Sequence, residues 1–415
     1  MVKHLKIAFT DSVKPWISSI EDRTYIPINE TDFTNIGAVV VSASEMDVLD
    51  NEQIRSFGIP VIVMVVDPSH TISFDMERIG AVIDVTSTSI NDYKGSIEQI
   101  VASYEALILP PFFKALSDYV GDNNAQFDCP GHQGGQFFAK HPTGRAFYDF
   151  FGDHIFRADL CNADVKLGDL LIHEGYAHDA QAHAAAVYNA DKTYFVLNGT
   201  SSANKVVLNA LLTPGDIILY DRNNHKSICH GGLVMSGATP IYLETARNPF
   251  GSIGGILEHC FDESYIRNLI REKDPNKAKA DRPIRLAVIQ LGTYDGTIYN
   301  ARQVVDKIGH LCDYIFFDSA WVGYEQFIPM MKDCSPLLLE LGPNDPGILV
   351  TQSVHKQQAG FSQTSQIHKK DKHIKGQDRY VDHKRFNNSF MMHASTSPFY
   401  PLFASLDVNA KIHEG

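Results

Sequence analysis

Four short polar segments of the sequence each follow an apolar run, and together they contain the groups needed for covalent chemistry on an amine. Their central residues are Thr200, His225, Asp318 and Lys356, in this order along the chain. Ligands of a mostly parallel sheet gather beyond the carboxyl ends of its strands. We therefore expect these side chains to meet at one edge of a sheet.

The first segment, Asn198–Lys205, is rich in small hydroxyl residues, including Thr200 and Ser201, and precedes a stretch with helical spacing. The N-terminus of a helix offers backbone N–H groups and a favourable dipole to a phosphate. An ordinary Ser/Thr helix cap has the same appearance, so this alternative stays open. The spacing does not match the P-loop pattern, which disfavours nucleotide hydrolysis.

Asp318 and Lys356 carry the two charges of the proposed site. A carboxylate at the end of a buried strand is costly unless a cation pairs with it, and a protonated pyridine nitrogen is a suitable cation. Asp318 could instead cap the next turn. A lysine at a buried strand end could have the pKa of its ammonium lowered by desolvation, as a Schiff-base lysine requires. Ser353 and His355, beside Lys356, could add phosphate contacts.

His225, in the segment Asp221–Ser227, is a candidate to stack on a cofactor ring, although a single histidine is more often structural. The order of the four segments is more informative than any one of them. A phosphate turn, an aromatic stacker, a carboxylate and then a lysine, each at a strand end, is the arrangement expected of a fold-type-I domain that binds pyridoxal 5'-phosphate (PLP).

Two other chemistries are disfavoured by spacing. His173 and His178, with Glu174, resemble a zinc-binding helix, but their five-residue separation turns the two imidazoles away from a common helix face. The six cysteines are scattered without a C-x-x-C pair, which favours reduced thiols over a zinc or disulfide framework. No G-x-S-x-G elbow supports a serine hydrolase. We expect no metal site.

The elements that position these residues divide into three regions. Residues 1–108 alternate strand and helix patterns, including a helical stretch at Ser96–Leu107, and predict a flavodoxin-like parallel sheet. Its expected strands are Leu5–Phe9, Ala38–Ser42, Val61–Val66 and Ala81–Val85. Residues 109–166 begin with a Pro-Pro break and are interpreted as a linker that wraps over a neighbouring domain.

Residues 167–415 predict a larger α/β domain with a mostly parallel sheet, because near-continuous apolar runs alternate with helix-length segments. Its expected strands are Thr193–Asn198, Ile217–Asp221, Thr239–Leu243, Leu286–Leu291, Tyr314–Asp318 and Ile348–Gln352. The basic stretch His368–Lys375 is interpreted as a solvated loop. Lys411–Gly415 has the pattern of a helix start, which suggests a partial sequence.

The composition indicates a soluble, cytoplasmic protein. The 415 residues are 44% hydrophobic and 20% charged, with a formal net charge of -13. This acidic balance, without a block of Lys or Arg, argues against nucleic-acid partners. The sequence contains no apolar run long enough for a signal peptide or a membrane span, so we expect no membrane partner.

With these motifs in hand, the sequence resembles the bacterial Orn/Lys/Arg decarboxylases, and within them the ornithine decarboxylases. The resemblance extends over essentially the whole chain. It is densest in Phe156–Val165, Asn198–Lys205, Asp221–Ser227, Leu291–Thr297, Phe317–Phe327 and Gln352–Ser365.

The resemblance implies a role for each site residue. Lys356 would bond covalently to PLP, Asp318 would pair with the pyridine nitrogen, and His225 would stack on the ring. Ala320 would pack on the opposite ring face, and Trp321 would line the site. The phosphate would be held by Thr200, Ser201, Ser353 and His355, with Thr396 reaching the phosphate of a neighbouring subunit.

The resemblance also implies a flavodoxin-like wing domain, a homodimer with shared active sites and larger ring-like assemblies. The expected reaction is decarboxylation of ornithine to putrescine, a step of polyamine biosynthesis. Lysine or arginine decarboxylation, aminotransfer and a non-catalytic homologue stay open as alternatives. Members of this family are much longer, so the C-terminal domain is expected to be absent here, and an inactive fragment is a further alternative. The sequence does not identify an effector.

Overall fold

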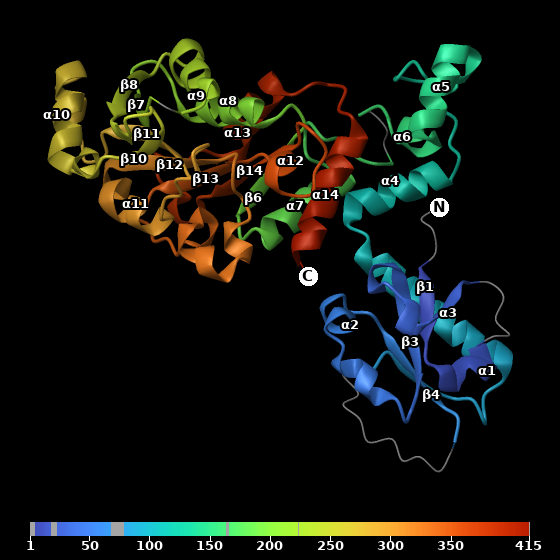
Figure 1. The fold of residues 1–415 in the computed structure, drawn as a ribbon. Coiled ribbons are helices and arrows are strands. Elements are labelled where there is room, and N and C mark those ends of the chain that lie inside the picture. Colours follow the sequence, from blue (N-terminus) through green and yellow to red (C-terminus); the bar gives the residue numbers. More distant parts are fainter. Residues whose placement is uncertain (1–4, 18–22, 68–78, 163–165, 223, 415) are drawn as a thin grey trace. The chain divides into compact units, whose positions relative to one another are not determined.

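The computed structural model describes residues 5–17, 23–67, 79–162, 166–222 and 224–414, and divides the chain into two compact units. The first ends at Pro110, and the second extends from Pro111 to Glu414 (Figure 1). Within the described ranges no single helix is long and apolar enough to cross a membrane. The successive helices α3 (Ile90–Ile108) and α4 (Pro111–Gly121) reach that length and composition only as a pair.

The first unit contains a five-stranded parallel sheet in the order β2-β1-β3-β4-β5. This is the strand order of flavodoxin-like folds, and the predicted fold class is confirmed. The strands are β1 (Lys6–Phe9), β2 (Tyr25–Pro27), β3 (Ile36–Ser42), β4 (Val61–Val65) and β5 (Ala81–Asp84).

Helices cover both faces of this sheet because its central strands are apolar on both sides. All seven residues of β3 and all five of β4 are buried, as expected for parallel strands. The helix α3 packs against one face through Tyr93, Ile97 and Val101. The short helices α1 (Lys14–Ile17) and α2 (Glu52–Ser56) contribute to the two opposite cores.

The second unit contains a seven-stranded sheet in the order β6-β14-β13-β12-β11-β7-β8. The strands β13, β12, β11, β7 and β8 are parallel, whereas β14 is antiparallel to both of its neighbours. Their bounds are β6 (Lys192–Val196), β7 (Ile217–Asp221), β8 (Thr239–Leu243), β11 (Ile284–Gln290), β12 (Cys312–Ser319), β13 (Gly347–Gln352) and β14 (Ser365–Lys370). The prediction of a mostly parallel sheet is confirmed.

Alternate residues of these strands enter two separate hydrophobic cores, which gives the unit its three layers. Ile315, Phe317 and Val350 pack in the core that contains the helices α10 (Glu263–Lys273) and α11 (Ala301–Ile308). Their neighbours Tyr314, Phe316 and Leu349 pack on the other side with α8 (Thr200–Leu211) and α13 (His383–His393). Figure 1 shows α8 and α13 above the sheet and α11 below it.

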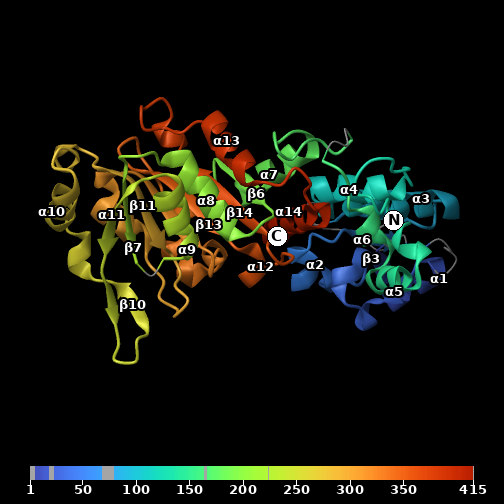
Figure 2. The ribbon, with the colours of Figure 1, turned by 90° about the horizontal axis from the view of Figure 1, so that it is seen from above.

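The remaining elements of the second unit surround this sheet. The helices are α5 (Pro142–Phe151), α6 (Asp153–Arg157), α7 (Gly175–Val187), α9 (Lys226–Cys229), α12 (Val354–Gln357) and α14 (Tyr400–Glu414). A hairpin of β9 (Thr245–Arg247) and β10 (Ile253–Ile256) projects away from the sheet (Figure 2). The helices α4, α7 and α14 pack around a third core, which includes Phe112 of α4, Phe403 of α14 and Leu170.

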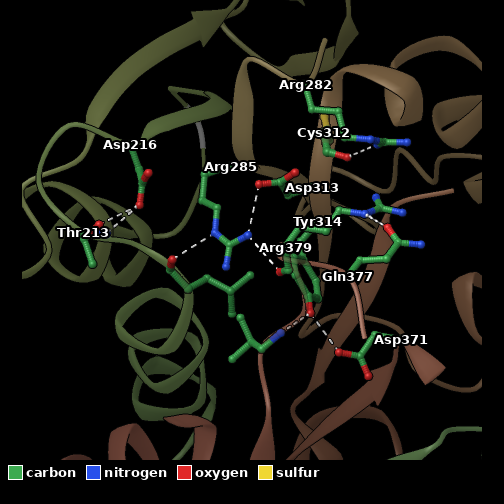
Figure 3. Close-up of polar contacts among 12 residues, drawn as sticks. Thr213, Asp216, Arg282, Arg285, Cys312, Asp313, Tyr314, Asp371, Gln377 and Arg379 are labelled. Carbon is green, nitrogen blue, oxygen red and sulfur yellow. Dashed lines mark hydrogen bonds and ion pairs between the residues drawn. The ribbon is translucent and has the colours of Figure 1, made fainter. Parts of the chain in front are cut away.

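The amino ends of β11 and β12 are held by a polar cluster (Figure 3). Arg285 donates to the Asp313 carboxylate at 3.0 Å, to the Leu211 carbonyl at 3.2 Å and to the Arg379 carbonyl at 3.0 Å. Burial nevertheless raises the pKa of Asp313. These contacts fix the edge of the sheet opposite to the candidate site.

Three interpretations of the sequence are corrected by the structure. The stretch His368–Lys375 is not a solvated loop, because β14 includes His368 and Lys369, which are buried between β6 and β13. The Lys369 ammonium is neutralised there by Asp371. The strands β2 and β14 and the β9–β10 hairpin were not expected. Lys411–Glu414 form the last turn of α14 and not the start of a helix.

The segment predicted as a linker, 109–166, contains α4, α5 and α6 and lies almost entirely within the second unit. Two side-chain contacts join its parts. The His132 Nε2 atom lies 3.0 Å from Asp159 Oδ2, and the thiols of Cys129 and Cys161 lie 3.3 Å apart. Whether this segment wraps over a neighbouring domain stays a prediction.

Candidate active site

The four predicted segments converge on one edge of the large sheet. The strand β6 is antiparallel to β14, which is antiparallel to β13, so β6 has the same direction as the parallel strands. The carboxyl ends of β6, β7, β12 and β13 therefore share an edge, where Thr200, His225, Asp318 and Lys356 follow or end them. This is the arrangement expected from the sequence.

Asp318 is 1% exposed, near the end of β12. Its Oδ2 atom accepts a hydrogen bond from the Asn204 amide at 2.9 Å, and its Oδ1 atom accepts one from the Ala320 backbone N–H at 3.1 Å. Burial raises the pKa of this carboxyl group, while the two hydrogen bonds and the nearby His225 and Lys356 oppose the rise. A carboxylate here is prepared for a cationic partner.

Lys356 lies on the single-turn helix α12, directly after β13, and not on the strand itself. Its backbone N–H donates to the Ser353 carbonyl at 3.0 Å. The ammonium nitrogen lies 3.9 Å from the centroid of the Trp321 ring, in cation–π contact. Although the residue as a whole is exposed, desolvation of the ammonium lowers its pKa, against the attraction of Asp318. A lowered pKa favours the neutral amine that reacts with a carbonyl group.

His225 is the N-cap residue of α9, after β7. Its Nδ1 atom lies 2.8 Å from the Ser227 hydroxyl and accepts a hydrogen bond from the Ser227 backbone N–H at 3.3 Å. Burial lowers the pKa of the imidazole, and Lys356 acts in the same direction, while Asp318 opposes both. We therefore describe His225 as a neutral ring at the edge of the site.

The hydroxyl-rich turn forms the third part of the site. Thr200 begins α8 and its hydroxyl lies 2.6 Å from that of Ser353 and 2.9 Å from that of Ser365. Gly199 precedes the helix with a φ of 79°, a conformation that favours glycine. Ser201 is exposed at this helix N-terminus. His355 donates from Nδ1 to the Thr364 carbonyl at 2.8 Å, which fixes its ring beside the turn.

A cavity of about 370 Å³ opens beside Lys356 and His225. Its walls include His225, Trp321 and Lys356, together with the carboxylates Asp221 and Asp295. The β9–β10 hairpin forms one wall, and two of its backbone N–H groups donate hydrogen bonds to side chains outside the hairpin. The Ile253 N–H donates to Asp295 at 3.2 Å, and the Ile256 N–H donates to Tyr299 at 2.8 Å. The cavity thus combines a lysine, an aromatic surface and negative charge.

The structure brings together most of the predicted residues. Ala320 follows Asp318 by two residues and is partly buried, next to Trp321. Thr396 is separate from this cavity, in an exposed bend between α13 and α14. Its proposed contact with a neighbouring subunit stays a prediction.

Three polar residues of the site were missed in the sequence. Asn204, Thr351 and Ser365 are fully buried and connect the groups described above. Asn204 could have been found, because it lies four residues after Thr200 and hence on the same helix face. Ser365 could not, because the antiparallel strand β14 was not recognised.

In the described part of the chain no group of three or more His, Cys, Asp or Glu side chains could hold a metal ion. His173 precedes α7 and is buried between Asn387 and Gln181, at 2.6 Å and 3.1 Å. Desolvation lowers the pKa of His173 to about 4. It is a neutral core residue.

The fold and the site define a two-unit α/β protein with a flavodoxin-like unit and a larger unit that carries a lysine, a buried aspartate and a hydroxyl-lined helix N-terminus at one sheet edge. Residues 110–415 match the family described as "Orn/Lys/Arg decarboxylase, major domain". The chain belongs to the Orn/Lys/Arg decarboxylase family, and the resemblance inferred from the sequence is confirmed.

Curated relatives are named for three substrates. The chain is 67% identical over 410 residues to an ornithine decarboxylase of Haemophilus influenzae, and 64% identical over 413 residues to an inducible ornithine decarboxylase of Escherichia coli. These alignments cover 99% of the chain but 57% and 56% of the relatives. A lysine decarboxylase of Pseudomonas aeruginosa is 37% identical over 82% of the chain. The chain therefore spans little more than half the length of the relatives it matches.

Solved structures agree with this assignment. A lysine decarboxylase from Pseudomonas aeruginosa superposes with a TM-score of 0.86 at 30% sequence identity, and one from Francisella novicida with a TM-score of 0.84 at 31%. Each covers 100% of the chain, which in turn covers 59% and 58% of those structures. Both units therefore have counterparts in these enzymes.

Proposed function

We propose that this chain binds PLP through Lys356 and that the protein decarboxylates L-ornithine to putrescine and carbon dioxide. The observation that carries the proposal is the fully buried carboxylate of Asp318 beside the lysine on the Trp321 ring. A buried carboxylate is stable when a cation pairs with it, and the protonated pyridine nitrogen of PLP is such a cation. When bound, PLP supplies an electron sink for the charge left by the departing carboxylate.

The residues of the chain fit this group. Asp318 would hold the proton on the pyridine nitrogen, with Asn204 fixing the carboxylate. Thr200, Ser201, Ser353 and His355 would bind the phosphate, where the first N–H groups of α8 and its dipole add to the hydroxyls.

Two aromatic residues and a small one would orient the ring. His225 would stack on one face and Ala320 would pack on the other, with Trp321 as a wall of the site. Each of these residues lies at the sheet edge described above.

Two observations favour a basic amino acid, and ornithine in particular. The cavity that contains Lys356 is also lined by Asp221 and Asp295, whose charge suits a substrate with a cationic side chain. Relatives named ornithine decarboxylase are 59% to 67% identical to the chain, whereas those named for lysine or arginine are 37% to 40% identical.

The proposal extends to assembly and location. We propose a homodimer in which Thr396 of one subunit reaches the phosphate site of the other, with larger ring-like assemblies formed from such dimers. A polyamine-forming decarboxylase of this kind would act in the cytoplasm. These proposals follow from the family resemblance.

The reaction is tested by measuring carbon dioxide release from ornithine, lysine and arginine. The assay uses this chain alone and the same chain extended by the C-terminal region of its Haemophilus influenzae relative. We expect ornithine to react fastest. Faster release from lysine or arginine would overturn the substrate, and formation of a keto acid would indicate an aminotransferase. Activity only in the extended protein would identify this chain as an incomplete enzyme.

The lysine is tested independently by spectroscopy. Lys356→Ala should abolish the visible absorption band that borohydride reduces, because the covalent bond to PLP requires the amine. Lys375→Ala, which removes an exposed lysine outside the site, is the control and should retain the band. A reducible band that persists in Lys356→Ala would refute the assignment of this lysine.

A further inference from the structure

A series of buried hydrogen bonds connects Thr351, Asn204, Asp318 and Ser227, and it ends at His225. The Thr351 hydroxyl donates to Asn204 Oδ1 at 2.8 Å, and Asn204 Nδ2 donates to Asp318 Oδ2 at 2.9 Å and to the Ser227 hydroxyl oxygen at 3.0 Å. The Ser227 hydroxyl lies 2.8 Å from His225 Nδ1. Asn204, Asp318, Ser227 and Thr351 are each at most 1% exposed.

The orientation of the Asn204 amide group determines which atoms donate and which accept in this series of hydrogen bonds. An ionised Asp318 only accepts hydrogen bonds, so the atom of Asn204 that contacts it must be the amide nitrogen. The same amide group has a second N–H, which is directed at Ser227 Oγ. The carbonyl oxygen is thereby left for the Thr351 hydroxyl, in agreement with the observed contact.

The proton of the Ser227 hydroxyl is then directed at His225. Ser227 Oγ already accepts from Asn204, and Nδ1 of His225 lies at hydrogen-bond distance from it. The Ser227 backbone N–H donates to the same Nδ1 atom at 3.3 Å. Because two donors converge on Nδ1, this nitrogen carries no proton, and the proton of the neutral ring resides on Nε2.

We propose that Ser227 and Asn204 are positioning residues that hold His225 as the neutral tautomer protonated on Nε2, so that the ring presents an N–H donor to the cavity. This inference rests on the proposed function, in which Asp318 is ionised by pairing with the cofactor. The N–H of His225 can donate to an anionic oxygen of an amino acid bound in the cavity, which Lys356 also lines. Among the described residues, Nε2 has no hydrogen-bond partner that would compete for this role.

The surroundings of His225 lower the pKa of its imidazole, although the nearby charges oppose one another. Burial lowers the pKa of the ring, and the cations Lys356 and Lys226 and the neighbouring His230 lower it further, while Asp318 alone raises it. The ring is therefore neutral near pH 7. Only a neutral imidazole has two tautomers, with the proton on Nδ1 or on Nε2. The hydrogen bonds to Nδ1 then select between the two neutral forms.

The inference is tested by deuterium exchange at the imidazole Cε1–H, whose rate as a function of pH reports the pKa of each histidine. Trypsin separates the relevant residues, because cleavage after Arg222 and Lys226 yields a peptide in which His225 is the only histidine. The peptide from Phe386 to Lys411 contains only His393 and serves as an internal control. The measurement is made on the intact, cofactor-loaded protein before digestion and involves no turnover.

Ser227→Ala removes the hydroxyl donor that stabilises the neutral ring, so the pKa of His225 should shift upward while that of His393 stays unchanged. Ser227→Thr retains the hydroxyl and should keep the wild-type pKa of His225. An unchanged His225 pKa in a folded Ser227→Ala protein would overturn the proposal. Should that variant fail to fold, Ser227→Cys preserves the side-chain size with a weaker donor, and the same upward shift is expected.

The result is separable from the proposed reaction. An unchanged pKa of His225 together with carbon dioxide release from ornithine would reject the tautomer and leave the decarboxylase proposal in place. The expected pKa shift in a protein that releases no carbon dioxide from any of the three amino acids would support the tautomer and reject the decarboxylase proposal.

Discussion

At the scale of single residues, Asp318 presents a balance between desolvation and hydrogen bonding. Its two hydrogen bonds, from Asn204 and from the Ala320 N–H, favour the ionised form, yet burial dominates and raises the pKa of the carboxyl group. A cation placed against the carboxylate reverses this balance, because an unpaired buried charge is more costly than a paired one. The Asp318 carboxylate is therefore most stable when its cationic partner is bound.

A substitution at Asp318 tests this balance. Asp318→Asn preserves the shape but removes the charge that keeps the pyridine nitrogen protonated. We expect the variant to bind PLP and its kcat for ornithine to fall by roughly 10²–10⁴-fold, the range typical of a group that controls a proton during the reaction. Cofactor absorbance and carbon dioxide release are measured on the extended protein. Asp333→Asn, at an exposed position, is the control, and a near-normal kcat in Asp318→Asn would remove the proposed role.

At the scale of elements, the turn that carries Lys356 depends on a distant helix. The helix α12 has four residues, too few to be stable by itself. Asn409, fully buried on α14, accepts from the Ala359 N–H at 2.9 Å and donates to Gln358 at 3.1 Å and to the Tyr188 hydroxyl at 2.9 Å. The end of the lysine turn is thereby attached to the core of the unit.

Removal of Asn409 should loosen this turn. Asn409→Ala leaves buried polar partners unsatisfied, and we expect the free energy of unfolding to decrease by about 2–3 kcal/mol. Dissociation of PLP should also be faster, since the backbone after Lys356 is no longer held. Urea unfolding and cofactor release are the measurements. Asn388→Ala, at an exposed position on α13, should change neither, and equal effects of both substitutions would contradict this role of Asn409.

The junction of α4 and α14 should respond to pH. Asp407 on α14 accepts from the N–H groups of Phe112 and Phe113 at 2.8 Å and 3.0 Å, at the start of α4. These bonds favour the carboxylate, but burial outweighs them and raises the pKa of Asp407 to about 6 from 3.8. Because the folded state binds the proton more tightly than the unfolded chain does, stability is lost as the pH rises from about 4 through about 6.

Asp407→Asn isolates this contribution. The amide oxygen can still accept both N–H groups, but the residue no longer ionises. Between pH 4 and pH 7 the stability of the wild type should therefore fall relative to the variant by about 3 kcal/mol at most, as the difference in pKa implies. Urea unfolding of the second unit at several pH values gives the comparison. Parallel pH profiles for the two proteins would show that Asp407 does not titrate in this range.

At the scale of the whole molecule, the chain consists of two compact units with separate hydrophobic cores. Ile62 in β4 and Ile315 in β12 are both fully buried, one in each sheet. Domains with their own cores can unfold separately. We therefore expect calorimetry to resolve more than one thermal transition.

Matched substitutions assign these transitions. Ile62→Ala and Ile315→Ala should each cost about 2–5 kcal/mol, the range for a buried isoleucine replaced by alanine. Each should lower the midpoint of one transition and leave the other nearly unchanged. A joint shift of all transitions by either variant would indicate that the two units unfold together.

Local sequence patterns were sufficient for the strands whose residues are buried on both faces. The near-continuous apolar runs of β7 and β13 predict their positions within one residue, because few other elements are uniformly apolar over so short a length. The strand β14 was missed, because its sequence, Ser-Gln-Ile-His-Lys-Lys, is polar. Several of its polar groups have partners on other strands, such as Gln352 of β13 for Gln366 and Thr193 of β6 for His368.

By itself, the sequence determined the order of Thr200, His225, Asp318 and Lys356 and their places at strand ends, and hence the edge at which they meet. The tertiary structure decided how they are held. The reversal of β14 places Ser365 beside Thr200 and leaves β6 parallel to β13, and the side chain of Asn204 joins Asp318 to Ser227 and so to His225. Strand positions follow from the burial of consecutive residues, which is visible in the sequence as a run of apolar residues. Hydrogen-bond partners more than a hundred residues apart depend on chain packing, which local patterns do not record.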